Sequence, residues 1–124
     1  MLQRRTVVGV VDNSLIKKAR IHHVYNKTGI ATVGDKVRLS VISRKPHCVH
    51  SKGDVILGLV VRVAFPIMRE NGSTIKHSSN DIVVLNNNGE MFHSTINSIV
   101  FREYNRKYKI DSVERAVSRS GKTI

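Results

Sequence analysis

The sequence has no tryptophan, one cysteine, two prolines and only nine acidic residues among 124. Cys48 cannot form a disulfide within the chain, which excludes a disulfide-stapled scaffold and agrees with a reducing compartment. The longest apolar run, Val55–Val61, is too short to cross a bilayer. Aromatic residues make up 5% of the chain, so the core has to consist mainly of Val, Ile and Leu. Branching at Cβ favours strands, and we therefore expect a mainly β protein.

The residues that catalysis and metal binding require are also scarce. The sequence contains no Gly-rich phosphate loop and no evident pair of catalytic carboxylates. His47, Cys48 and His50 share one short loop, but a zinc site requires four ligands, and loop histidines near RNA are the alternative. A nucleophilic cysteine would need an orienting base and an oxyanion hole, which this loop does not offer. We therefore expect no metal, no cofactor and no enzymatic activity.

Positive charge is what the sequence has in excess. Lys and Arg total 21, which gives a formal net charge of +12. In a chain this small, a polyanion usually relieves such self-repulsion between cations. Nucleic acid is the usual polyanion, because each neutralised phosphate releases condensed counterions and so favours binding. No basic amphipathic helix is evident, so an acidic membrane is a poorer partner. The charge predicts a nucleic-acid-binding protein, with a merely soluble basic protein as the alternative.

Short β-branched runs, separated by turn signals, predict the strands. Lys36–Ser43 alternates apolar and polar residues, as a half-buried strand does. Gly34-Asp35 and Gly53-Asp54 each predict a turn that leads into a strand. Gly can adopt the positive φ that such a turn requires, and Asp can accept bonds from nearby N–H groups. Gly58 predicts a bend or bulge. The expected strands are Thr6–Val11, Arg20–Tyr25, Lys36–Ser43, Val55–Val63 and Asp81–Leu85, with a hairpin from Ile67-Met68 to Thr74–Lys76 around Asn71-Gly72.

The pattern becomes helix-compatible from Ser98 onward. Phe101, Tyr104 and Tyr108 recur near one helical turn, and Asp111 could cap a last helix. Closing the strands into a barrel removes exposed sheet edges. We therefore expect a small five-stranded β-barrel with a short helical C-terminal extension. The expected organisation is a single domain over residues 1–124: barrel about 1–97, helical extension about 98–118 and short tail 119–124.

Short motifs follow one another in a fixed order along almost the whole chain. They are Val11-Asp12-Asn13-Ser14, Val33-Gly34-Asp35, Lys52-Gly53-Asp54-Val55, Val60-Val61-Arg62, Asn71-Gly72-Ser73 and Val83-Val84-Leu85-Asn86. This ordered set resembles the ribosomal protein fourteen family of the large subunit. The resemblance implies a five-stranded barrel with a helical extension that binds large-subunit rRNA near the subunit interface. It also implies contacts with neighbouring ribosomal proteins, a bridge to small-subunit rRNA and docking of factors that block subunit joining.

A structural constituent of the large ribosomal subunit is thus the expected function. The alternative is a free-standing barrel that binds single-stranded RNA or DNA. Such a protein should display a platform of aromatic residues, whereas Tyr25, Phe65 and Phe92 are scattered along the barrel sequence. This scatter favours the ribosome.

Departures from the family pattern suggest the compartment. Leu15-Ile16 stands where the family usually has Gly-Ala, and the stretch Ser94–Glu103 lacks the usual Gly and Pro. The stretch Ile21–Lys27 resembles mitochondrial relatives, and no transit peptide is visible before the first strand. We expect a mitochondrial ribosome, with a bacterial or other organellar ribosome as the alternative.

Cations in loops and at strand starts are the candidate RNA contacts, because phosphate contacts need Lys and Arg. Arg62 lies in an apolar strand, so we expect it to project outward to phosphate, with a pair to a neighbouring acid as the alternative. For the loop cations the alternative is a solvated basic surface. The candidates are Arg4, Arg5, Lys17, Lys18, Arg20, Arg44, Lys45, Lys52, Arg62, Arg69 and Lys76.

A second set interleaves basic and aromatic residues in the C-terminal segment. The residues are Arg102, Tyr104, Arg106, Lys107 and Lys109, and we expect them at the bridge to the small subunit. The alternative is the solvated face of an amphipathic helix. Phe101, Tyr104 and Tyr108 could stack on bases, but their helical spacing favours packing against the barrel.

Overall fold

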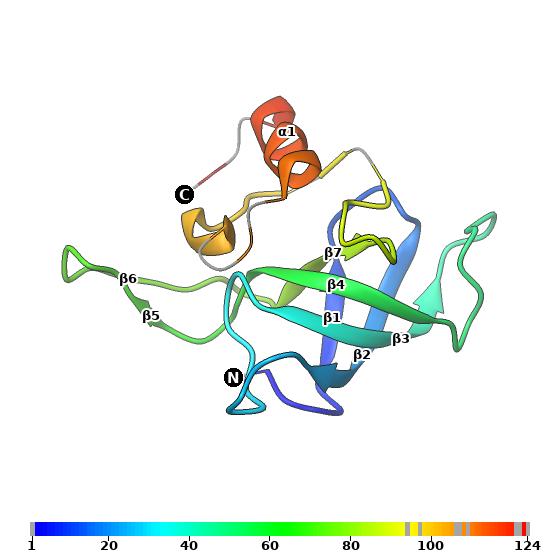
Figure 1. Cartoon of the computed structure of the whole chain (residues 1–124), viewed down its shortest axis with the longest axis horizontal. Coiled ribbons are helices and arrows are strands. Elements are labelled where there is room, and N and C mark those ends of the chain that lie inside the picture. The colour runs from blue at the N-terminus through cyan, green and yellow to red at the C-terminus, as the bar shows by residue number, and fades with distance from the viewer. Residues whose placement is uncertain are drawn as a thin grey trace.

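Five strands close into a barrel in the computed structural model, which describes residues 2–93, 95–96, 98–105, 108, 110–120 and 123. The strands are β1 (Val7–Val10), β2 (Ile16–Val24), β3 (Lys36–Arg44), β4 (Val55–Arg62) and β7 (Asp81–Leu85). Their order around the barrel is β1-β2-β3-β4-β7 (Figure 1). Neighbouring strands are antiparallel except β1 and β7, which pair in parallel and close the barrel. The expected fold class is confirmed.

Two Gly-Asp turns begin β3 and β4 in the same way, as the sequence predicts. Gly34 and Gly53 both have φ of 89°, a left-handed conformation that favours glycine. The carboxylate of Asp35 accepts a bond from the Thr32 amide (2.8 Å), and that of Asp54 from the Ser51 amide (2.7 Å). Each glycine amide then donates to the opposite strand, Gly34 to Val60 and Gly53 to Val41, at 2.8 Å. The two turns therefore fix the register of β3 against β4 at both ends.

Gly58, where the sequence predicts a bend or bulge, forms no bulge. Gly58 pairs in regular register with both Val37 and Val84, so no bulge occurs there. A Cβ at this position would lie 2.6 Å from Cδ1 of Leu39. The glycine therefore makes room for a core side chain rather than for a bulge. The register shifts occur between Val60 and Arg62 and at three places along β2.

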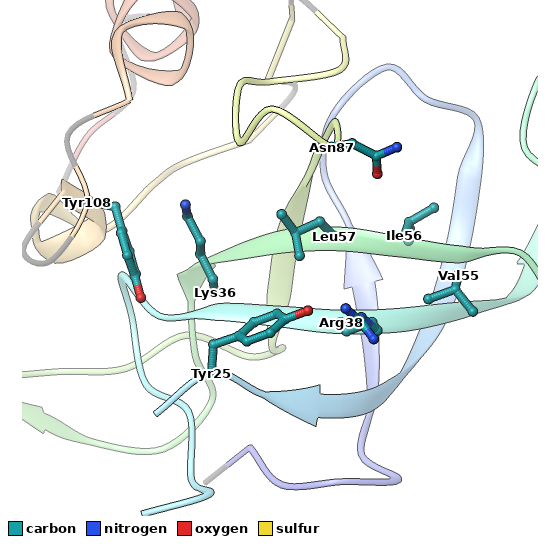
Figure 2. Close-up of a pocket in the computed structure, with 8 residues that line it drawn as sticks. All are labelled: Tyr25, Lys36, Arg38, Val55, Ile56, Leu57, Asn87 and Tyr108. Carbon is teal, nitrogen blue, oxygen red and sulfur yellow. The ribbon is translucent and has the colours of Figure 1, made fainter. Parts of the chain in front are cut away.

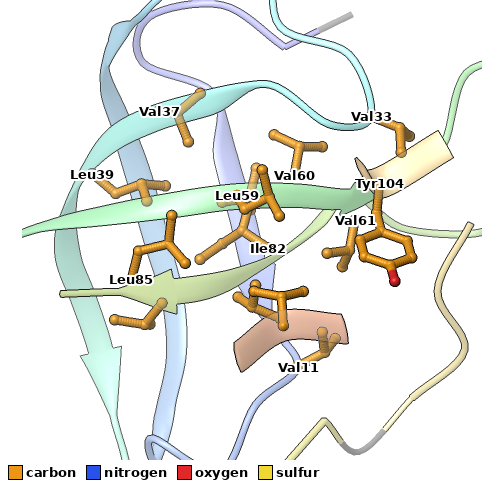
Figure 3. Close-up of a cluster of buried hydrophobic side chains, with 14 of the residues drawn as sticks. Val11, Val33, Val37, Leu39, Leu59, Val60, Val61, Ile82, Leu85 and Tyr104 are labelled. Atoms are coloured by element: carbon orange, nitrogen blue, oxygen red, sulfur yellow. The ribbon is translucent and has the colours of Figure 1, made fainter. Parts of the chain in front are cut away.

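The core consists of Val, Ile and Leu, as the scarcity of aromatic residues requires. Val37, Leu39, Leu59, Val60 and Ile82 are fully buried and converge inside and around the barrel wall (Figure 3). Packing of this kind supplies about 25 cal/mol for each Å² of apolar surface removed from water. The barrel is therefore held by β-branched packing and does not depend on a disulfide.

A short hairpin projects from the barrel between β4 and β7 (Figure 1). Its strands are β5 (Ile67–Met68) and β6 (Thr74–Ile75), which pair around Asn71-Gly72 as expected. Gly72 has a φ of 85°, and Asn71 Oδ1 accepts a bond from the Ser73 amide at 3.0 Å. Met68 is 78% exposed at this site.

The C-terminal segment packs over one side of the barrel and forms the short helical extension that the sequence predicts. It forms a 3₁₀ helix η1 (Arg102–Asn105) and an α-helix α1 (Asp111–Ser120). The Ile110 carbonyl accepts the first helical bond, from the Glu114 amide, so Asp111 is the first helical residue and not the cap. The helix also continues to Ser120, past the expected end at residue 118. None of the helices in the described ranges is long and apolar enough to cross a membrane.

Leu15 adopts a left-handed backbone conformation, with φ of 66°. This is the position where Leu15-Ile16 replaces the Gly-Ala of the resembled family. A side chain at positive φ costs about 1–2 kcal/mol. Leu15 thus adopts a backbone geometry that suits glycine, and its carbonyl accepts a bond from the Lys45 amide at 2.7 Å.

Candidate nucleic-acid interface

The strands β1, β2 and β3 contain no acidic residue, although they carry several cations. Residues 1–53 hold eleven of the 21 Lys and Arg residues but only two of the nine acids, Asp12 and Asp35. Both of these acids are buried. The outer surface of this half of the barrel therefore carries positive charge with almost no acidic side chain to neutralise it.

Bulges in β2 turn extra cations outward. The pairing of β2 with β3 shifts between Ile16 and Lys18 and between Lys18 and Ala19. As a result, Lys17 and Lys18 are both exposed while their neighbours Ile16 and Ala19 are buried. A bulge inserts an extra residue and redirects side chains, so two consecutive cations can face solvent.

The register of the sheet places small hydroxyl residues beside these cations. Lys18 pairs with Ser43, and Arg20 pairs with Ser40. Serine hydroxyls can donate to phosphate or sugar oxygens, and their small size leaves the cations accessible. We call this outward surface the basic face; its exposed cations are Lys17, Lys18, Arg20, Arg38 and Arg44.

The basic face differs from the expected set in two respects. Lys17 and Lys18 were expected just before the second strand and Arg20 at its start, but β2 begins at Ile16 and contains all three. Arg38 was not among the candidates, although the alternation of Lys36–Ser43 already indicated that it points away from the core. It is exposed and pairs with His23 on β2.

Other predicted RNA contacts surround the barrel. Arg4 and Arg5 precede β1, while Lys45 and Lys52 lie in the loop between β3 and β4. Lys76 directly follows β6 on the projecting hairpin. All five side chains are exposed and available to a ligand.

Arg62 does not project outward, so that prediction is wrong. Its side chain is buried, and its Nε forms an ion pair with Asp81 Oδ2. One terminal nitrogen donates to Ser98 Oγ and lies 3.4 Å from the Ile99 carbonyl oxygen. Ser79 Oγ also donates to the same carboxylate, at 2.6 Å. The alternative, a pair with an acid, is what the structure shows: the pair joins the end of β4 to β7, and the guanidinium bonds to Ser98 and Ile99 join β4 to the C-terminal segment.

Two further candidates have protein partners. Arg69 Nε lies 2.8 Å from Glu103 Oε1, so this carboxylate neutralises part of the guanidinium charge. Tyr104 is buried, and burial together with Glu114 raises the pKa of its hydroxyl. Its ring therefore packs against the barrel, as does that of Phe101. Arg102 is exposed on η1, whereas Arg106, Lys107 and Lys109 lie outside the described residues.

The loop histidines form a small cluster at another part of the barrel. His50 Nε2 lies 3.2 Å from His93 Nε2, and Phe92 packs edge-on against His50. Burial and the nearby His93 lower the pKa of His50, while Asp12 and Asp54 partly oppose this shift. Cys48 Sγ donates to the Ser14 carbonyl at 3.1 Å. Among the described residues, no three His, Cys, Asp or Glu side chains meet in a way that could hold a metal ion.

The family that the sequence matches binds RNA, which agrees with this charge distribution. Residues 1–118 match the family model described as ribosomal protein L14p/L23e. The chain belongs to this family. Members of the L14p/L23e family are structural ribosomal proteins that bind rRNA, so the chain is a ribosomal protein of the large subunit. The expected family is confirmed.

Proposed function

We propose that the basic face is the surface through which this L14p/L23e protein holds large-subunit rRNA. The observation that carries the proposal is the complete lack of acidic residues in β1, β2 and β3, where Lys17, Lys18, Arg20, Arg38 and Arg44 are exposed. Phosphate contacts position a protein on RNA without reading its sequence. Arg4, Arg5, Lys45, Lys52 and Lys76 extend the positive surface around the barrel.

Arg62 is not part of the proposed RNA contact, because its guanidinium is buried against Asp81. Arg69 is a secondary contact, since Glu103 already neutralises part of its charge. The proposal therefore distinguishes cations that stabilise the fold from cations that bind RNA. This separation can be tested with variants that change the same net charge at different places.

The double variant Lys18→Gln/Arg20→Gln should weaken binding to purified large-subunit rRNA about 10- to 100-fold at physiological salt. Each lost phosphate contact should also lower the slope of log K against log salt by about 0.7–0.9. The matched control is Lys27→Gln/Arg115→Gln, which removes the same charge from exposed positions outside the basic face. Filter binding over a salt series measures both quantities. Equal losses in the two variants would show that only net charge matters and would contradict the proposal.

We further propose that the C-terminal segment contributes to a bridge with small-subunit rRNA and to docking of factors that control subunit joining. Arg102 is exposed on η1, and Arg106, Lys107 and Lys109 add positive charge in the sequence of the same segment. Tyr104 would act indirectly, since its buried ring anchors η1 to the barrel. The divergent Leu15-Ile16 and Ile21–Lys27 support a mitochondrial ribosome as the location.

A sucrose gradient of organelle-enriched lysate tests both parts. The tagged chain should migrate with the large subunit after magnesium removal separates the subunits. At ordinary magnesium, Arg102→Glu should lower the share of tagged chain in joined ribosomes relative to the unsubstituted chain. An unchanged share would argue against the bridge, and absence from the organelle fraction would assign the protein to another ribosome.

A further inference from the structure

A groove of about 530 Å³ lies on the outer side of β3 and β4 and shares Arg38 with the basic face (Figure 2). Its walls come from distant parts of the chain. Tyr25 follows β2, Asn87 follows β7, and Tyr108 belongs to the C-terminal segment. The fold thus brings two tyrosines, 83 positions apart in the chain, to one depression.

Two cations lie at the tyrosines. Lys36 Nζ lies 4.4 Å from the ring centroid of Tyr108, and the guanidinium carbon of Arg38 lies 5.6 Å from that of Tyr25. A cation over an aromatic face is attracted by the ring quadrupole, which holds both partners in place. None of the described residues that line the groove is acidic. The groove is therefore positively charged as well as aromatic.

The remaining lining residues supply an apolar floor and one side-chain amide. Val55 is 59% exposed, and Ile56 and Leu57 are half-buried, so apolar surface is open to solvent at the floor. The amide of Asn87 is exposed on the loop above this floor (Figure 2). An aromatic face, an apolar floor, cations and one side-chain amide together match the base, phosphate and polar edge of a nucleotide.

We propose that this groove binds one unpaired nucleotide of single-stranded RNA. The base lies against Tyr25 and the apolar floor, its phosphate lies at Lys36 and Arg38, and Asn87 bonds a polar edge of the base. The inference rests on the proposed rRNA-binding function and adds a requirement for an unstacked nucleotide. A duplex does not meet this requirement, because its base faces are covered by stacking. The two cations, together with the absence of acids among the described lining residues, favour RNA over an apolar protein segment.

Anisotropy of a labelled RNA tests the groove, with a short single-stranded oligoribonucleotide and a duplex of the same sequence as probes. Tyr25→Leu should weaken single-strand binding about 5- to 100-fold, which is the range for loss of one stacked base. Binding of the duplex should stay within about twofold, because it uses the basic face. Phe92→Leu is the control: its 49% exposed ring lies in the adjoining depression, which shares the apolar floor, so the variant tests whether any nearby ring suffices and should change neither affinity. Since the chain has no tryptophan, tyrosine fluorescence should also fall when the single strand binds.

Asn87→Asp supplies a second variant in case Tyr25→Leu unfolds the barrel. The side chain is exposed, so the fold should tolerate a carboxylate, which would repel phosphate and weaken single-strand binding more than fivefold. If a folded Tyr25→Leu variant keeps full single-strand affinity, or Asn87→Asp does, the groove proposal is overturned while binding through the basic face stands. If the unsubstituted chain binds neither probe, the proposed RNA-binding face fails as well.

Discussion

Replacing Arg62 by methionine should lower the free energy of unfolding by about 3–5 kcal/mol. The substitution keeps most of the side-chain volume but leaves the buried carboxylate of Asp81 without its cation. It also removes the bonds from the guanidinium to Ser98 and to the Ile99 carbonyl. Urea denaturation followed by circular dichroism measures the loss, since no tryptophan is present to report unfolding.

Arg69→Met is the matched control for this experiment. Arg69 also pairs with an acid, Glu103, but both side chains are 21% exposed, compared with 10% and 7% for Arg62 and Asp81. Ion pairs that water reaches contribute about 0–1 kcal/mol. The double variant Arg62→Met/Asp81→Leu should regain part of the stability, because no buried charge is left uncompensated. If Arg62→Met costs no more than Arg69→Met, the buried Arg62 network does not stabilise the junction of β4 with β7 and the C-terminal segment.

Gly34→Ala should destabilise the protein by about 2–5 kcal/mol, although it adds only a methyl group. The left-handed backbone at φ of 89° costs a side chain about 1–2 kcal/mol. The added Cβ would also lie 2.8 Å from the carbonyl oxygen of Glu103 in η1, a backbone atom that cannot move away alone. Overpacking of this kind typically costs about 1–3 kcal/mol.

Gly53→Ala separates these two causes. Gly53 has the same φ of 89° and begins β4 as Gly34 begins β3, but no heavy atom lies within 4 Å of its added Cβ. We expect only the backbone cost, about 1–2 kcal/mol. The difference between the two variants in the unfolding free energy measures the packing of η1 on the Gly34 turn. Equal losses would mean that η1 yields without cost.

The local patterns of the sequence were sufficient for most of the barrel. Alternation in Lys36–Ser43, the two Gly-Asp turns and Asn71-Gly72 each describe interactions between residues close in the chain, and all three predictions are confirmed. The start of β2 was missed because its bulges break the alternation on which strand prediction depends. The bulge expected at Gly58 was wrong because an interior glycine can equally make room for a neighbour, here Leu39.

The sequence by itself determined a mainly β, strongly cationic protein, because strand propensity and net charge belong to residue types and not to their positions in space. Only the tertiary structure decided which cations are available to a ligand. Arg62 and Arg38 both lie in strands, yet Arg62 is buried against Asp81, 19 positions away, while Arg38 faces solvent. The tertiary structure also creates the groove. Tyr25 and Tyr108 come to line one depression only after the barrel closes and the C-terminal segment packs on it. Ion pairing and burial depend on which distant residues become neighbours, and the closure of the barrel fixes those neighbours.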